Sequence, residues 1–314
     1  MFVFYAPTKV VFGEGAVEVV GDEVSKLGKK ALIVTGRRSA RESGLLQKIL
    51  DSMKSSGVSA VVFDRVVPNP PIENVVEGSR IARREDVDVV VGVGGGSSLD
   101  AAKAIAAAAV LGEDIERYLF PNTVEKALPV VAVPTTCGTG SEVTRYSILT
   151  HLGRRKKVVL AGTALIPRTA VVDPTTLRTL TPNMVAWTAV DALSHAVEAL
   201  LSRSSNPIAA MYAAEAVGLV FSNVVEAYRE KSPDALSRLH LASLLAGVAI
   251  NNCGTVLVHA LGYYLTAWHG VHHGLANALY LPHVLYAVKN HDVVNSKLAP
   301  AMKRLGLGLS LIHI

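Results

Sequence analysis

An aspartate and a histidine lie four residues apart in the sequence DALSHAVEAL, residues 191–200. The alanines and leucines around them are typical of a buried helix, on which Asp191 and His195 would lie on one face. A carboxylate and an imidazole on one face can bind a metal ion together, but for the pair taken alone a buried hydrogen bond between them is the favoured explanation.

A second cluster, residues 256–283, is VLVHALGYYLTAWHGVHHGLANALYLPH. It contains five of the chain's ten histidines, namely His259, His269, His272, His273 and His283. One aspartate with two or three histidines forms an oxygen and nitrogen ligand set that suits Fe, Zn, Mn, Co or Ni rather than a metal that prefers thiolates. The two clusters together therefore predict a metal site.

A glycine-rich turn lies within VVVGVGGGSSLDAAKA, residues 89–104. A strand leads into Gly94, Gly95 and Gly96, and a helix begins at Ser97 and Ser98. Glycines let the backbone approach a ligand closely, and the free N–H groups at the start of a helix suit a phosphate. The spacing is not G-x-G-x-x-G, and an ordinary strand-to-helix turn is the alternative, but we favour a nucleotide phosphate site.

A second polar loop, PTTCGTGSEVT, covers residues 134–144 and follows the next predicted strand. It offers the hydroxyl groups of Thr135, Thr136 and Thr144. Ligands of open α/β sheets bind at the carboxyl ends of the strands, so this loop would form a second wall of the same pocket.

The elements that carry these residues change along the chain. Short β-branched runs at 29–36, 59–67, 87–96 and 129–136 alternate with helical stretches, which predicts a parallel sheet with helices on its faces. After Asp173 the pattern is all-helical, with expected helices at 183–202, 207–230, 233–251, 255–268, 273–289 and 292–305. We therefore expect an α/β domain with a parallel, Rossmann-like sheet at 1–165 and an all-α domain, which carries the predicted metal ligands, at 166–314.

Composition narrows the class of protein. Half of the 314 residues are hydrophobic, and the net charge of +5 comes from scattered basic residues, which argues against nucleic-acid binding. The basic run 154–157 suits a solvated turn or a phosphate contact. Cys137 and Cys253 form no CxxC pair, which favours a reducing compartment. No signal-peptide pattern and no apolar run near the roughly 18 residues of a membrane span are present. We expect a cytoplasmic protein with no membrane partner.

Five motifs together resemble the iron-containing (group III) alcohol dehydrogenases of the dehydroquinate-synthase-like superfamily. They are GGGSSLDAAKA, PTTCGTGSEVT, DPTTL, DALSHAVEA and HGLANALYLPHV, and the resemblance runs from Lys9 to about Gly306. It implies a dinucleotide-binding domain, a helical domain and a catalytic divalent metal in the cleft between them. The first motif adds Asp100 to the expected cofactor site.

The resemblance also implies the metal ligands, which are Asp191, His195, His259 and His273, with Fe²⁺ or Zn²⁺ as the ion. It leaves His283 as a structural or cleft residue. Many members of the family carry a further histidine where this chain has Tyr263. A tyrosine hydroxyl could relay a proton there, or the role could pass to His269 or His272. Tyr263 and His269 are the catalytic candidates.

The nicotinamide cofactor is expected to be NADP(H) rather than NAD(H). NAD-preferring members of the family often have an aspartate at the position of Gly36, and here that carboxylate is absent and Arg37, Arg38 and Ser39 follow. Guanidinium groups match phosphate, although a solvated basic turn would have the same sequence. Asn69 and Lys157 match further cofactor-contacting positions of the family.

The expected activity is reversible hydride transfer between the nicotinamide cofactor and a small primary alcohol or aldehyde, in a homodimeric enzyme. A dehydroquinate-synthase-like lyase is one alternative, but it would need a strongly basic cleft, whereas the helical half offers Tyr263, Tyr264 and Trp268. An inactive homologue is another, because the final residues, LGLSLIHI, differ from the family's continuation and predict a chain shortened at its C-terminus.

Overall fold

The computed structural model describes residues 1–304 and 306, and it contains two compact units. The α/β unit comprises residues 7–136 and 141–179, and the helical unit comprises residues 1–6, 137–140 and those from 180 onward. The domain boundary expected between residues 165 and 166 stays a prediction. The departure from the family sequence after Gly306 concerns residues 307–314, which lie outside the described residues.

The α/β unit is built on a six-stranded, wholly parallel sheet with the order β1-β8-β5-β4-β2-β3, which confirms the predicted fold class. A separate antiparallel pair is formed by β6 and β7. The strands are β1 (Lys9–Phe12), β2 (Lys30–Gly36), β3 (Ser59–Val66), β4 (Val89–Gly94), β5 (Val130–Pro134), β6 (Tyr146–His151), β7 (Lys156–Ala161) and β8 (Thr169–Val172).

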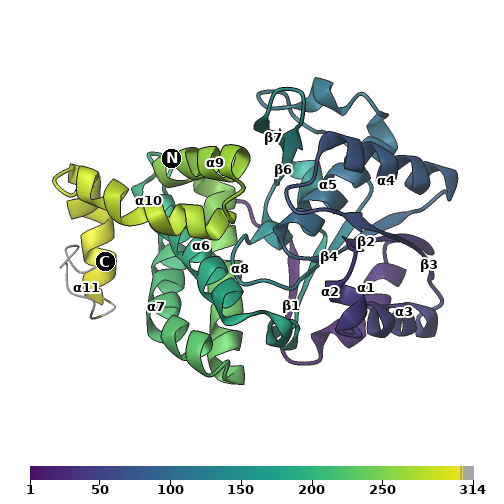
Figure 1. The fold of residues 1–314 in the computed structure, drawn as a ribbon, viewed down its shortest axis with the longest axis horizontal. Helices are drawn as coiled ribbons and strands as arrows, with labels where there is room; N and C mark the ends of the chain where they lie inside the picture. Colours follow the sequence, from purple (N-terminus) through teal and green to yellow (C-terminus); the bar gives the residue numbers. More distant parts are fainter. Residues whose placement is uncertain (305, 307–314) are drawn as a thin grey trace. The chain divides into compact units, whose positions relative to one another are not determined.

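Helices cover both faces of this sheet, as the alternation of strands and helical stretches predicted. On one face α4 and α5 pack against Leu32, Val34 and Val90, and on the other α1 and α3 pack against Ile33 and Val91 (Figure 1). The helices are α1 (Val20–Ser25), α2 (Ser39–Glu42), α3 (Leu45–Ser55), α4 (Ile72–Arg84) and α5 (Gly96–Leu111). Short 3₁₀ turns lie at Ala16–Val19, Ile115–Tyr118, Ser141–Val143, Thr163–Leu165 and Pro174–Thr179.

The sequence did not predict four of the strands. β1 and β8 have four residues each, too few to show a period, and β1 lies at the edge of the sheet with mostly exposed side chains. β6 and β7 form a hairpin outside the main sheet, and Arg154 and Arg155 of the basic run 154–157 lie exposed in the turn between them, whereas Lys156 and Lys157 begin β7. A solvated turn thus fits the first two residues of the run, and the alternative of a phosphate contact stays a prediction.

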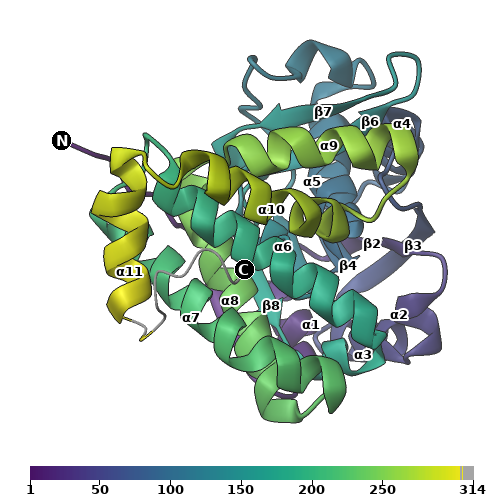
Figure 2. The ribbon, with the colours of Figure 1, turned by 60° about the vertical axis from the view of Figure 1, so that its left-hand side comes forward.

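The helical unit has the predicted succession of helices, and α6, α9 and α10 lie side by side in both views (Figure 2). The first three helices begin with proline at the first helical position after a capping residue: Thr181, Asn206 and Ser232 each accept a hydrogen bond from the N–H three residues on. The helices are α6 (Pro182–Leu201), α7 (Pro207–Arg229), α8 (Pro233–Cys253), α9 (Leu257–His269), α10 (His273–Val288) and α11 (Ala299–Arg304), with a π-helical turn at Val294–Leu298.

Two helices of this unit, α6 and α7, are long and apolar enough to cross a membrane by length and composition, and a bent pair, α8 and α9, would add a third. No uninterrupted apolar run of that length marks these helices in the sequence, because polar residues interrupt α6, whereas its mean hydropathy is still high. In α6, 78% of the apolar window is buried inside the protein, and in α7 the share is 33%. α6 is thus a core helix, and the absence of a membrane partner stays a prediction.

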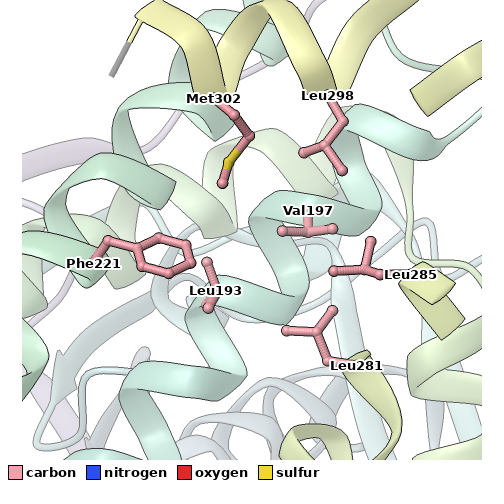
Figure 3. Close-up of a pocket in the computed structure, with 7 residues that line it drawn as sticks. All are labelled: Leu193, Val197, Phe221, Leu281, Leu285, Leu298 and Met302. Carbon is pink, nitrogen blue, oxygen red and sulfur yellow. The ribbon is translucent and has the colours of Figure 1, made fainter. Parts of the chain in front are cut away.

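One face of α6 packs into an apolar pocket together with α7, α10, the π-helical turn and α11 (Figure 3). The pocket has no ionisable side chain in its lining, so it offers packing and no acid–base or metal chemistry. The lining residues are Leu193, Val197, Phe221, Leu281, Leu285, Leu298 and Met302.

Candidate metal centre and nucleotide site

Three of the four predicted metal ligands converge inside the helical unit. Asp191 and His195 come from α6 and His259 from α9, and one ligand atom of each lies within 4.8 Å of the others. Their side chains are nearly inaccessible, with exposed fractions of 3%, 6% and 2%. A buried carboxylate between two imidazoles is a donor set that suits a divalent cation.

The Nδ1 atoms of His195 and His259 each donate a hydrogen bond to an oxygen acceptor. His195 Nδ1 donates to the backbone carbonyl of Gly138 at 3.1 Å, and His259 Nδ1 donates to the carboxylate of Glu198. Because a carbonyl or carboxylate oxygen only accepts, each Nδ1 carries a proton, and in the neutral form of each ring the Nε2 lone pair is left for another partner. His259 Nε2 is buried, has no hydrogen-bond partner and lies 3.7 Å from Asp191 Oδ1. A cation bound beside Asp191 fits this orphaned nitrogen.

His273, the fourth predicted ligand, begins α10 and lies at the edge of the same cluster. Its Nε2 is 4.0 Å from Asp191 Oδ1, and its ring centroid is 5.4 Å from that of His259. Its Nδ1 lies 3.4 Å from the hydroxyl of Thr266, and its Nε2 is 3.2 Å from the amide nitrogen of Asn277. The structure therefore brings His273 to the carboxylate shared by the other ligands.

Two glycines let the three helices come close enough for this arrangement. A Cβ on Gly274 would lie 2.1 Å from the carbonyl oxygen of Trp187, so α10 touches the backbone of α6 there. A Cβ on Gly262 would lie 2.0 Å from the side-chain Oδ1 of Asn277, so the buried amide of α10 packs directly against the backbone of α9. Both contacts need a residue without a side chain.

The charges within the cluster are strongly coupled. Burial, together with the nearby His259, lowers the pKa of His195 to about 4. Burial would lower the pKa of His259 as well, but the attraction of the Asp191 and Glu198 carboxylates for the charged ring outweighs this and raises the pKa to about 9. Burial opposes ionisation of Asp191, yet the imidazoles of His195 and His259 hold its pKa below the usual range. The cluster thus stabilises one positive charge beside an ionised carboxylate.

The remaining histidines and Tyr263 differ in their distance from the cluster. The ring of Tyr263 stacks on His273 with 5.2 Å between centroids. His272, which precedes α10, packs against Trp187 at 5.2 Å, and burial lowers its pKa. His269 ends α9, is exposed and contacts Tyr264 edge-on. It follows Tyr263 by six residues, which places it on another side of the helix. His283 is exposed on α10.

Sequence reasoning missed two residues that contact the ligands, Glu198 and Asn277. Glu198 follows His195 by three residues and Asp191 by seven, so helical spacing puts all three on one face. Asn277 follows His273 by four residues and donates a 2.8 Å hydrogen bond to Asp191 Oδ1. Helical spacing from a predicted ligand is the signal that both residues carry in the sequence.

The predicted nucleotide-binding residues lie in the α/β unit, where parallel strands end at one edge of the sheet. β2 ends at Gly36, its neighbour β4 at Gly94 and the next strand, β5, at Pro134. The chain leaves β2 to form β3 on one side and returns to form β4 on the other, which makes the β2–β4 pair a topological switch point. Open α/β sheets bind ligands at such points.

The turn after β4 is tightly packed. Gly94 has a φ of 143°, and a Cβ there would lie 2.6 Å from the hydroxyl of Ser98. A Cβ on Gly95 would lie 3.0 Å from the side chain of Thr136 in the second polar loop, and Thr135 N–H donates to Gly94 O at 3.0 Å. The two predicted walls are therefore in contact, and helix α5 begins at Gly96.

Asn69 and Lys157 form a third part of this edge. Asn69 Oδ1 accepts a 2.6 Å hydrogen bond from Lys157 Nζ, and Asn69 N–H donates to Ser97 Oγ at 3.1 Å. Lys157 Nζ also contacts Thr150 Oγ1 at 3.2 Å. Burial lowers the pKa of Lys157 to about 8. The loop after β3 and the hairpin strand β7 thus meet the glycine-rich turn. Arg37 is exposed just beyond Gly36.

Asp100 and Thr144 lie underneath this surface. The Asp100 carboxylate accepts from Ser141 Oγ at 2.5 Å and from the N–H of Ile148 at 2.9 Å, and it pairs with the buried Lys103 at 3.1 Å. Lys103 Nζ also reaches Thr144 Oγ1 at 3.4 Å. The structure places both predicted residues where they hold the polar loop to α5, and their part in cofactor binding stays a prediction.

Comparison with known proteins identifies the family to which this chain belongs. The family described as iron-containing alcohol dehydrogenase matches residues 7–174, and the C-terminal region of the Fe-containing alcohol dehydrogenase family matches residues 185–312. The chain belongs to the iron-containing alcohol dehydrogenase family.

Individual relatives of this family agree with the match. Alcohol dehydrogenase 4 of Saccharomyces cerevisiae is 39% identical over 308 residues, which span 96% of this chain and 78% of the yeast protein. The 1,3-propanediol dehydrogenase of Citrobacter freundii is 39% identical over 289 residues, which span 90% of this chain and 74% of that protein. A solved structure of a 1,3-propanediol oxidoreductase matches with a TM-score of 0.92 at 36% identity, covering 99% of this chain and 81% of the other.

Membership in the family supports an alcohol dehydrogenase rather than the lyase considered as an alternative. The expectation of an oxidoreductase that acts on alcohols is thereby confirmed, and the family implies a metal and a nicotinamide cofactor. The ligands of that metal and the choice of cofactor stay predictions.

Proposed function

We propose that the chain is a metal-dependent, NADP(H)-preferring dehydrogenase of small primary alcohols, which also reduces the corresponding aldehydes. The observation that carries the metal part of this proposal is the buried, unpartnered Nε2 of His259 beside Asp191. A buried polar atom without a partner is costly, and a bound cation would satisfy it.

The proposed ligands are Asp191, His195, His259 and His273, with Fe²⁺ or Zn²⁺ as the ion. A divalent cation held there would act as a Lewis acid toward the oxygen of an alcohol or aldehyde. The chain itself contributes a negative carboxylate, which attracts the cation. It also contributes the imidazoles of His195 and His259, whose Nδ1 atoms are already hydrogen-bonded. This preorganisation lowers the cost of assembling the ligand set.

Tyr263 is the favoured proton donor and acceptor of the two catalytic candidates. Its ring stacks on His273, so its phenol lies beside the proposed ligand set and could exchange a proton with a substrate oxygen bound there. His269 remains the second candidate, although its contact is with Tyr264 and its side chain is exposed.

The proposed cofactor site consists of residues at the carboxyl ends of the parallel strands. The nicotinamide cofactor would supply the hydride chemistry. The glycine-rich turn and the start of α5 offer N–H groups to its phosphates, and Asn69 and Lys157 add side-chain donors. These residues are Gly36, Arg37, Asn69, Gly94, Gly95, Gly96, Ser97, Ser98, Asp100, Thr135, Thr136, Thr144 and Lys157.

The preference for NADP(H) rests on the end of β2. No carboxylate follows Thr35, and Arg37 and Arg38 are exposed where a 2′-phosphate could reach them. Relatives of both kinds are known: one from Bacillus methanolicus is named NAD-dependent methanol dehydrogenase and is 35% identical, and one from Clostridium saccharobutylicum is named NADPH-dependent butanol dehydrogenase and is 32% identical.

We further propose a cytoplasmic homodimer. Both described cysteines are free, which fits a reducing compartment. β1 is an edge strand of the sheet with exposed Val10 and Phe12, and such an edge can pair with a second copy. Light scattering would measure the mass, and a monomer at micromolar concentration would contradict this part.

The activity is tested by following the oxidation of NADPH and NADH with a series of short aldehydes, on protein purified anaerobically and analysed for metals. We expect aldehyde reduction with a higher kcat/KM for NADPH, and loss of activity on chelation. A clear preference for NADH would contradict the cofactor assignment, and full activity in metal-depleted protein would contradict the metal assignment.

A further inference from the structure

We propose that Glu198 is a positioning residue that orients His259 for metal binding and anchors the start of α9. The inference rests on the proposed function, because it assumes that His259 is a metal ligand. Glu198 itself lies on the far side of the imidazole and would not touch the ion.

The carboxylate of Glu198 is fully buried, with an exposed fraction of 0%. One oxygen accepts a 2.6 Å hydrogen bond from the N–H of Val258. The other accepts from His259 Nδ1 and lies 3.4 Å from the N–H of His259. A single side chain of α6 therefore binds both the backbone and the ring of the ligand on α9.

These contacts determine which ring nitrogen of His259 is available to bind a metal ion. The carboxylate requires a proton on Nδ1, so a neutral imidazole held there presents its lone pair on Nε2, the atom that lies 3.7 Å from Asp191 Oδ1. Rotation of the ring would break the bond to Glu198 and turn Nδ1 toward the carboxylate of Asp191. Glu198 thus selects one ring orientation, and its negative charge increases the basicity of the ligand.

The backbone contacts determine where the ring is placed. The first N–H groups of a helix have no partner within the helix, and Val256, the residue before α9, provides no side-chain cap. Glu198 takes over this role from a neighbouring helix, and its charge is favourable at the positive end of the helix dipole. The first turn of α9, which contains His259, is thereby tied to α6, which carries Asp191 and His195.

A purely structural role for Glu198 predicts different behaviour from a positioning role. If the carboxylate only stabilised the packing of α9 on α6, its replacement would lower thermal stability and leave the affinity of the folded protein for metal unchanged. A positioning role predicts a loss of metal affinity beyond any loss of stability. The two quantities must therefore be measured together.

The test compares Glu198→Gln with Glu142→Gln. Glutamine keeps the size of the side chain but retains one acceptor oxygen, which cannot serve both Val258 N–H and His259 Nδ1. Glu142 is equally inaccessible but lies in the α/β unit, in the turn Ser141–Val143, so its replacement controls for the loss of a buried carboxylate. Co²⁺ is titrated into chelator-treated protein and followed by its visible absorption, and thermal unfolding is recorded without metal.

We expect Glu198→Gln to bind Co²⁺ about 10- to 100-fold more weakly than the unmutated protein, and Glu142→Gln to match the unmutated protein. Equal Co²⁺ affinity of Glu198→Gln and the unmutated protein would overturn the inference while leaving the proposed function intact. If His259→Ala bound Co²⁺ as tightly as the unmutated protein, the proposed metal site itself would fail, which is a distinguishable result.

Nitrogen-15 NMR of the unmutated, Zn²⁺-loaded protein tests the same inference without a substitution, should Glu198→Gln not fold. We expect His259 to be bound through Nε2, with a proton on Nδ1 that is shifted downfield by the carboxylate. Coordination through Nδ1 would overturn the inference.

Discussion

The side-chain amide of Asn277 donates a 2.8 Å hydrogen bond to Asp191 Oδ1 and lies 3.2 Å from His273 Nε2. Asn277 is itself fully buried on α10, one turn after His273. The amide of Asn277 thus connects Asp191 on α6 to His273 on α10. The relative position of these two proposed ligands depends on it.

Replacing Asn277 by alanine should weaken metal binding. The substitution removes the donor that orients Asp191 and leaves a cavity next to His273, so we expect metal affinity to fall about 10- to 100-fold and the free energy of unfolding to fall by about 1–3 kcal/mol. Asn223→Ala is the control, since Asn223 is a buried asparagine of α7 that donates to Leu219 O. Equal metal affinity of both variants would refute the role of Asn277.

Adding a methyl group at Gly274 should separate α10 from α6. The new Cβ would lie 2.1 Å from Trp187 O, a backbone atom that cannot move without its helix. We expect Gly274→Ala to lose about 1–3 kcal/mol of unfolding free energy and to retain less metal, because His273 is the adjacent residue. Gly153→Ala, in the exposed hairpin turn, should behave as the unmutated protein in thermal unfolding and metal analysis. An unaltered Gly274→Ala would show that the close contact is not needed.

The affinity for NADPH should depend on pH through Lys157. Burial lowers the pKa of Lys157 to about 8, so the free protein loses this positive charge as the pH rises from 7 to 9. If the ammonium binds a cofactor phosphate, the dissociation constant should rise by up to ~10-fold per pH unit above the pKa. Fluorescence titration of NADPH should show this rise in the unmutated protein and in Lys156→Met, and a flatter profile in Lys157→Met. Identical profiles for Lys157→Met and the unmutated protein would exclude the contact.

Placing a carboxylate at the end of β2 should change the choice of cofactor. A Cβ on Gly36 would have Val66 O at 3.7 Å as its nearest contact, so an aspartate can be accommodated. Its charge would repel a 2′-phosphate and accept hydrogen bonds from ribose hydroxyls. We expect Gly36→Asp to lower the ratio of kcat/KM for NADPH to that for NADH by at least about tenfold, or about 1.4 kcal/mol. An unchanged ratio would show that the adenosine ribose lies elsewhere.

Much of the fold could be predicted because its elements have strong local signals. The buried strands β2, β4 and β5 are continuous apolar runs between helical stretches, and α6, α7 and α8 begin with a capping residue followed by proline. β1 and β8 could not be found in this way, since a strand of four residues is defined by the neighbours with which it pairs. β6 and β7 lie outside the main sheet and pair with each other, so each is likewise defined by its partner.

The candidate metal site shows a similar limit. Helical spacing pairs Asp191 with His195 within one helix. Their approach to His259 depends on the packing of two helices, which leaves no periodic pattern in the sequence. Gly262 and Gly274 are ordinary glycines in the sequence, and only the structure shows that a side chain at either would collide with a neighbouring helix. Glu198 and Asn277 had the right spacing, yet nothing in the sequence shows that they contact a ligand.

The central claim is that Asp191, His195, His259 and His273 hold one divalent cation. Metal analysis of anaerobically purified protein tests it most directly, applied to the unmutated chain and to His259→Ala, with unfolding curves to confirm that the variant is folded. We expect close to one equivalent of Fe²⁺ or Zn²⁺ in the unmutated protein and near-complete loss of metal and alcohol oxidation in His259→Ala. Stoichiometric metal in folded His259→Ala, or alcohol oxidation at the unmutated rate without metal, would contradict it.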